Sequence, residues 1–165
     1  MNTANPSQCP GNATEWSLCY YKSTTTSAVA YLAVYRPSLN GNQYSLVSGS
    51  YSSYSISSNP AFYFYYCSKF LLQQSQQFAV QQGDVIAACV RPSGSGRVGI
   101  VARTTGSLKA LLYTGNPAIT CGTQLPSSIL MTRLTSTPIT LHVSLGVSSL
   151  CALYCSLGRF CFRYQ

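Results

Sequence analysis

The segment AVAYLAVYR at residues 28–36 decides the fold class of this chain. Successive side chains of an extended strand point to opposite faces, so a two-residue period divides this segment into two faces. Pro37 ends the segment, because proline has no N–H with which to continue a strand ladder. The pattern predicts a β-strand with one face against a hydrophobic core, and that face consists of Ala28, Ala30, Leu32 and Val34.

Short strand-like segments recur along the rest of the chain, separated by clusters of Gly, Pro, Asn and Ser. The pair Asn40-Gly41 favours a tight hairpin turn. Gly83 supplies the positive φ of another turn, which Asp84 is expected to cap by accepting backbone N–H bonds. One short helical turn is expected within residues 70–78. Strands are expected at residues 16–22, 28–36, 44–48, 50–56, 62–67, 85–90, 98–102, 108–114, 129–134 and 139–145.

About nine antiparallel strands of this length must pack as two layers or close on themselves. We therefore predict an all-β fold, an antiparallel and jelly-roll-like β-sandwich of about nine strands, over residues 9–146. Residues 147–165 contain three of the eight cysteines and no partner-strand pattern. They are expected to form a Cys-rich tail, either disordered or the remnant of a membrane anchor.

The anchor alternative rests on the uncharged stretch 134–158, which Arg159 and Arg163 follow. That order suits one membrane span with a basic flank. However, residues 139–145 alternate as a strand, and if the sandwich uses them, residues 147–157 alone are too short to cross a bilayer. The tail cysteines of an anchored chain would be palmitoylation sites instead of disulfide partners.

The charge of the chain is unusual because acids are missing, not because bases are abundant. Two acids, Glu15 and Asp84, stand against ten Lys and Arg, which gives a net charge of +8. The bases are dispersed, with the densest group at residues 91–109, whereas a nucleic-acid footprint is a clustered stripe. We therefore expect no nucleic-acid partner.

The same scarcity of ionisable groups argues against enzyme chemistry. His142 is the only histidine, it alternates with Leu141 and Val143 in an expected strand, and no G-x-S-x-G elbow is present. An acyl-transfer hydrolase would have to combine His142, Asp84 and a serine. Two distant acids cannot hold calcium, and no C-x-x-C pair indicates zinc. We expect no catalytic residue, no cofactor and no metal.

The glycines Gly94, Gly96 and Gly99 match the dinucleotide fingerprint only as letters. That site needs a helix after the glycines, and residues 98–102 are strand-like. The motif is interpreted as a hairpin turn.

Eight cysteines in a β-rich chain favour disulfides and an oxidising compartment. The sequon Asn12-Ala13-Thr14 is a candidate glycosylation site and agrees with that compartment. Residues 1–20 show no secretory leader pattern, so we expect that Met1 is not the true start or that the chain is a piece of a larger extracellular protein. The cysteines expected to form buried disulfides within the sandwich are Cys9, Cys19, Cys67, Cys89 and Cys121.

Three stretches carry a resemblance to a known kind of module. They are CPGNATEWSLCYY at residues 9–21, VYRPS with YSLV between residues 34 and 47, and FAVQQGDVI at residues 78–86. Their order and spacing resemble a β-sandwich module of large extracellular and cell-surface proteins of early-branching invertebrate animals. The resemblance implies an extracellular or cell-surface location and a binding or adhesion role, and it brings no catalytic residue.

Tyrosines interleaved with serines between residues 44 and 66 are the most informative surface feature. Tyrosine offers a large rigid face with a polar tip, and serine offers adaptable hydrogen bonding, which is the composition of good binding surfaces. A protein or a glycan is the expected ligand. Two alternatives stay open: these tyrosines line the core, or the chain is a structural spacer without a ligand. The candidate binding residues are Tyr51, Tyr54, Tyr63 and Tyr65.

Overall fold

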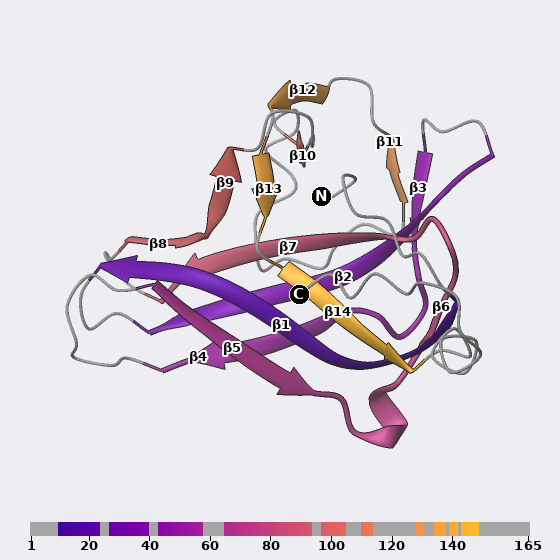
Figure 1. Cartoon of the computed structure of the whole chain (residues 1–165), viewed down its shortest axis with the longest axis horizontal. Helices are drawn as coiled ribbons and strands as arrows, with labels where there is room; N and C mark the ends of the chain where they lie inside the picture. Colours follow the sequence, from indigo (N-terminus) through magenta and orange to yellow (C-terminus); the bar gives the residue numbers. More distant parts are fainter. Residues whose placement is uncertain are drawn as a thin grey trace, which may run out of the picture.

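The computed structural model shows a chain built from β-strands in two antiparallel sheets (Figure 1). It describes residues 10–23, 27–39, 43–57, 65–93, 97–104, 110–113, 128–130, 134–137, 139–141 and 143–148. Within these residues no α-helix occurs, and a single 3₁₀ turn, η1 (Gln74–Gln76), lies in the segment where a short helical turn was expected.

The first sheet is organised around β2 (Ala28–Pro37). β7 (Val85–Pro92) pairs with it along one edge. On the other edge, β4 (Ser52–Ile56) pairs with the first half of β2 and β3 (Gln43–Leu46) with its end. β11 (Ser128–Leu130) adds to β3. The edge of β2 that faces away from β7 is thus covered by two short strands, β4 and then β3.

Ser50 closes the gap in that divided edge. Its hydroxyl is fully buried, accepts a hydrogen bond from the Val34 N–H at 3.1 Å and donates one to the Val34 carbonyl at 3.2 Å. The Val34 carbonyl also accepts the Val47 N–H at 2.9 Å. Buried backbone N–H and C=O groups that lack a strand partner need another hydrogen-bond partner. Ser50 supplies one for Val34 at the point where the chain passes from β3 to β4.

The second sheet is organised around β1 (Gly11–Ser23) and has the same divided plan. β14 (Val143–Ser148) and β8 (Arg97–Ile100) pair in turn along one edge. β5 (Tyr65–Leu71) and the short β6 (Ala79–Val80) pair along the other. Two further ladders stand apart: β9 (Ala102–Thr104) with β13 (Ile139–Leu141), and β10 (Ala110–Tyr113) with β12 (Leu134–Thr137).

The hydrophobic core lies between the two sheets. Trp16, Leu18 and Tyr20 point inward from β1 and meet the alternate residues that the sequence placed on one face of β2. Trp16 and Leu32 are fully buried, and the Trp16 ring lies 6.2 Å from the ring of Phe78. Each large apolar side chain removed from water contributes about 1.5–3 kcal/mol, so this inner layer holds the sandwich together.

The predicted antiparallel β-sandwich is confirmed. The described chain has fourteen strand segments, more than the number expected, because several sheet edges are assembled from two short strands. Gly83 has the positive φ expected of it, +90°. β14 continues to Ser148, two residues past the expected end of the sandwich at residue 146. Three expected features lie outside the described residues: the tail at 149–165, the turn at 40–42 and the glycine motif at 94–96. In the part of the chain that is described, no helix has the length and hydrophobicity needed to cross a membrane.

Candidate functional site

The outward face of the first sheet carries a cluster of tyrosine, serine and arginine. Val29 and Tyr31 of β2 alternate with the core-facing residues and so point away from the core. The register places Ser55 and Arg91 on either side of Val29, and Ser53 and Cys89 on either side of Tyr31. We call this surface the outer tyrosine face; it consists of Val29, Tyr31, Tyr51, Ser53, Ser55, Cys89 and Arg91.

Tyr31 and Tyr51 form the centre of the outer tyrosine face. Their ring centroids are 6.3 Å apart and their planes differ by 13°. Tyr51 keeps 39% of its surface exposed, Tyr31 is half-buried, and the serines beside them are exposed. Partial burial, together with the charge that Tyr31 would carry nearby, raises the pKa of the Tyr51 hydroxyl above its usual value. The pair therefore presents near-parallel aromatic rings with hydroxyl tips.

Tyr54 does not belong to this surface. It is opposite Ala30 of β2, on the inner side of the sheet, and its ring stacks on Phe70 at 4.2 Å with an interplanar angle of 18°. Phe70 belongs to β5 of the other sheet, so this contact closes the sandwich, as in the core-lining alternative. Tyr63 lies outside the described residues, and Tyr65 is described only as a backbone position of β5.

The far end of the same outward face is closed to solvent. Ala33, Tyr35 and Val85 are buried there and pack with Tyr44 and Leu46. Burial raises the pKa of the Tyr35 hydroxyl to about 12. The tyrosines of this chain therefore divide into buried and exposed members, and in the described residues of this face only the Tyr31–Tyr51 end offers an open aromatic surface.

Comparison with protein-family models, with curated proteins and with solved structures gives no match. The function must therefore be argued from the residues and their geometry.

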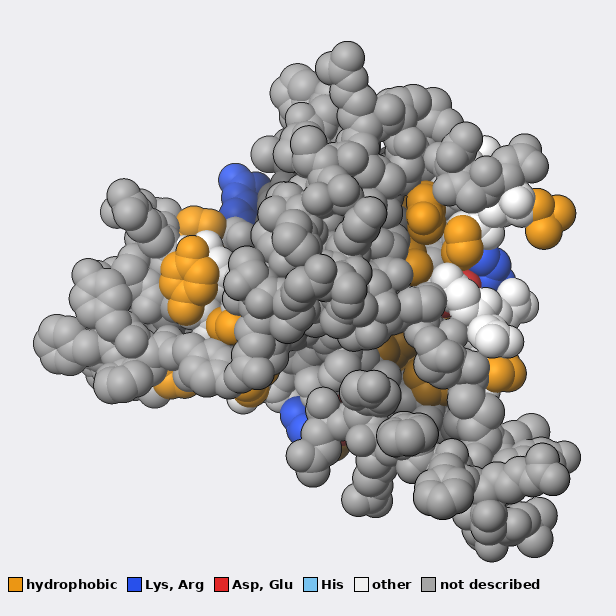
Figure 2. Space-filling model, turned by 45° about the horizontal axis from the view of Figure 1, so that its top comes forward, with side chains coloured by type: hydrophobic (Ala, Val, Ile, Leu, Met, Phe, Trp, Pro, Cys, Tyr) orange, Lys and Arg blue, Asp and Glu red, His pale blue; other side chains and the backbone are white. Residues whose placement is uncertain are grey.

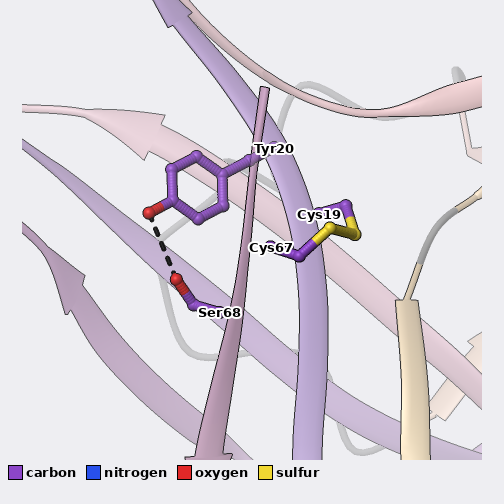
Figure 3. Close-up of a disulfide and its surroundings, with 4 residues drawn as sticks. All are labelled: Cys19, Tyr20, Cys67 and Ser68. Atoms are coloured by element: carbon purple, nitrogen blue, oxygen red, sulfur yellow. Dashed lines mark hydrogen bonds between the residues drawn. A yellow bond between two sulfur atoms is a disulfide. The ribbon is translucent and has the colours of Figure 1, made fainter. Parts of the chain in front are cut away.

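Cys19 and Cys67 form a disulfide between β1 and β5 (Figure 3). Cys89 is also disulfide-bonded, and its partner is not among the described cysteines. Cys9 and Cys121 lie outside the described residues. The expectation that Cys19 and Cys67 take part in a disulfide is confirmed. The bond is not buried as expected, because Cys67 is exposed and both cysteines lie on the outward face of their sheet.

Asp84 caps its turn as the sequence predicts, accepting the Gln81 N–H at 2.8 Å. It also has a partner that sequence reasoning missed: Arg36 donates from Nε to Oδ1 at 2.8 Å and from Nη2 to Oδ2 at 2.9 Å. This bidentate contact raises the pKa of Arg36, against a smaller opposing effect of burial. Asp84 is 2% exposed, and its contacts join the turn before β7 to Arg36 of β2.

The structure adds no support to the hydrolase alternative. His142 lies outside the described residues, and the groups around Asp84 are an arginine and a backbone N–H. Among the described side chains, no three of His, Cys, Asp and Glu come together as metal ligands would.

Both acids of the chain are held by bases. Glu15 accepts a hydrogen bond from Lys69 Nζ at 3.1 Å, on the outward face of the second sheet. Because Asp84 is held by Arg36, each acid already has a cationic partner while the chain as a whole carries a large excess of bases. Among the described side chains on the face shown in Figure 2, the blue cationic groups lie apart from one another.

Asn12, the candidate glycosylation site, has an exposed side chain near the start of β1. The Thr14 hydroxyl of the same sequon donates a hydrogen bond to the Gly146 carbonyl at 3.2 Å. In the folded chain the asparagine is thus accessible while the threonine is engaged with β14.

Sequence reasoning missed Tyr31 and Arg91 as surface residues. The signal for Tyr31 was present, since it alternates with Ala30 and Leu32 and must face the other way. Arg91 becomes a neighbour only through the pairing of β7 with β2.

Proposed function

We propose that this chain is a non-enzymatic, extracellular binding module that contacts a glycan through the outer tyrosine face. The observation that carries the proposal is the near-parallel Tyr31–Tyr51 pair, in which Tyr51 is exposed and Tyr31 half-buried, flanked by exposed serines. A sugar ring has an apolar C–H face and a rim of hydroxyls. Aromatic rings match the former and serine hydroxyls the latter.

A glycan suits this surface better than a protein partner does. Protein interfaces have a centre of large apolar or aromatic anchors from which water is excluded. Here the aromatic pair is bordered by Ser53 and Ser55, which leave the surface polar and hydrated. Such a surface favours a ligand that itself exposes many hydroxyls.

The charge of the chain favours an acidic sugar. Arg91 is exposed on the outer tyrosine face, and the residues that form this face include no acid. The net charge of +8 adds a long-range attraction for anions. We therefore infer that the ligand is a glycan bearing carboxylate or sulfate groups.

The extracellular location is supported by the Cys19–Cys67 bond and by the disulfide-bonded state of Cys89, because disulfides persist in oxidising compartments. The exposed Asn12 side chain suits an N-linked glycan in that location. An adhesion role at a cell surface agrees with the sequence resemblance described above.

The test is binding to an array of neutral and acidic glycans, followed by titration of the best ligand. Replacing both rings, Tyr31→Ala with Tyr51→Ala, is expected to weaken binding at least about ten-fold, the loss typical of a central aromatic contact. Tyr21→Ala is the matched control, because Tyr21 is a tyrosine 51% exposed on the outward face of the other sheet.

Two results would count against the proposal. Binding that survives the double change removes the outer tyrosine face as the site. A chain that binds no glycan at all is better described as a protein-binding module or as a spacer.

A further inference from the structure

The Cys19–Cys67 disulfide has an unusual place in the fold. The two residues are directly opposite each other on neighbouring antiparallel strands, with Cα atoms 4.0 Å apart. This bond links two strands that are already neighbours in a ladder.

The bond lies at a position where the two strands exchange no backbone hydrogen bonds. The Cys19 carbonyl accepts the Val101 N–H at 2.9 Å, on the side of β1 that faces away from β5. The N–H and C=O of one strand residue point to the same side, so Cys19 and Cys67 form a non-hydrogen-bonded pair. The Cα atoms of such pairs are the closest in an antiparallel ladder, at about 4.5 Å.

The hydrogen-bonded pairs on either side of the disulfide hold the strands without it. They are Leu18 with Ser68 and Tyr20 with Tyr66. On the core side, the Tyr20 and Tyr66 rings lie 6.0 Å apart, and the Tyr20 hydroxyl is 3.3 Å from the Ser68 hydroxyl (Figure 3). The backbone ladder and the core contacts of β1 and β5 therefore do not depend on the sulfur–sulfur bond.

The two cysteines are exposed to different degrees. Cys67 is exposed and Cys19 is half-buried. Both point away from the core, where Trp16 and Leu18 are packed. A reagent can thus reach Cys67 without opening the sandwich, and cleavage of the bond uncovers no core residue.

We propose that the Cys19–Cys67 bond is a site of thiol–disulfide exchange, opened in the folded protein by an external dithiol that attacks at Cys67. The attacking thiolate forms a bond to Cys67 Sγ, the Cys67–Cys19 bond breaks, and Cys19 leaves as a thiolate that takes up a proton. The second thiol of the dithiol then attacks the mixed disulfide and releases Cys67. The dithiol becomes a disulfide, and two electrons and two protons pass to this chain.

The position of the bond explains why exchange occurs there. Rates of exchange depend on access to the sulfur that is attacked, and Cys67 supplies that access. Exposed disulfides are the ones that dithiols reduce most readily, whereas buried structural disulfides resist. Reduction leaves a folded sandwich with two thiols on one outward face, Cys67 exposed and Cys19 beside it. This inference does not depend on the proposed glycan contact.

The experiment reduces the native protein with dithiothreitol, alkylates the new thiols at intervals and maps them by mass spectrometry. Trp16, the single tryptophan and fully buried, reports unfolding through its emission. Alkylation of Cys19 and Cys67 is expected to rise in proportion to dithiothreitol and to be at least about ten-fold faster than any change in Trp16 emission. Labelling that appears only together with the Trp16 change would overturn the proposal, because the bond would then open only through unfolding.

Two further measurements locate the attack. With glutathione, a monothiol, the first mixed disulfide trapped by rapid acid quenching is expected on Cys67; a first adduct on Cys19 contradicts the proposed direction. The double variant Cys19→Ser, Cys67→Ser is expected to keep the β-sheet circular dichroism and the native Trp16 emission, and to lose the fast labelling. A double variant that fails to fold would show that the bond is structural and would overturn the proposal.

Discussion

At the scale of single residues, this chain separates its tyrosines by environment. The Tyr51 ring is open to solvent beside Tyr31, Tyr54 stacks on Phe70 between the sheets, and Tyr35 is completely buried. Tyrosine therefore forms exposed surface at one position and packs in the interior at another. Because the tyrosine hydroxyl titrates, the burial of Tyr35 has a measurable effect on stability.

Tyr35 predicts a loss of stability at alkaline pH. Its pKa of about 12 in the folded chain exceeds the ordinary value of 10, so the folded state holds the proton more tightly than the unfolded state does. Its contribution is complete below pH 10 and disappears as the pH rises to about 12. The loss is about 2–3 kcal/mol at the upper end of this window.

Denaturant unfolding between pH 8 and about 12 tests this expectation. Tyr35→Phe should flatten the fall in the free energy of unfolding, because phenylalanine has no hydroxyl to titrate. Tyr51→Phe is the comparison variant and should flatten the fall less, because Tyr51 is more exposed than Tyr35. An equal fall in wild type and in Tyr35→Phe would assign the alkaline instability to other groups.

At the scale of elements, close approach between β1 and β14 makes one glycine more important than another. A Cβ on Gly11 would clash with the backbone carbonyl oxygen of Ser148, which is fixed by the ladder. A Cβ on Gly146 would meet the flexible side chain of Glu15, whose Cγ would lie 2.5 Å away. Gly11→Ala is therefore expected to cost about 1–3 kcal/mol, and Gly146→Ala less.

The melting temperatures of the two variants check this order. A cost of 1 kcal/mol lowers the midpoint by about 2–4 °C in a domain of this size. The contrast between the two glycines matters more than either value, since both sites lie in the same pair of strands. An equal or larger effect of Gly146→Ala would show that Glu15 cannot move aside.

Local patterns in the sequence predicted the strands well, and they did not predict the contacts between strands. Alternation identified β2 and its core face, and Gly83 with Asp84 identified a turn. The Arg36–Asp84 pair joins residues 48 positions apart, and only the pairing of β2 with β7 brings them together. Alternation alone puts Tyr51 and Tyr54 on opposite faces of an extended chain, but which of the two faces is buried depends on the partners of β4.

At the scale of the whole molecule, the excess of bases acts together with the aromatic surface. Since both acids are already held by Arg36 and Lys69, an approaching anion meets a field that few carboxylates oppose. Such an attraction acts over about 8–10 Å at physiological salt and weakens as salt rises. It is not selective by itself, so the position of one arginine must decide where the anion binds.

Arg91→Gln separates the local charge from the overall charge. If Arg91 pairs with an anionic group of the glycan, its removal is expected to weaken binding of an acidic oligosaccharide about five- to ten-fold and to reduce the salt dependence of the affinity. Binding of the neutral form of the same oligosaccharide should not change.

Lys69→Gln lowers the net charge equally but acts on the outward face of the other sheet, and it should have little effect on either ligand. Isothermal titration at low and high salt gives all of these values. Equal losses in the two variants would mean that the ligand responds to total charge, and the outer tyrosine face would then have no anion-binding position of its own.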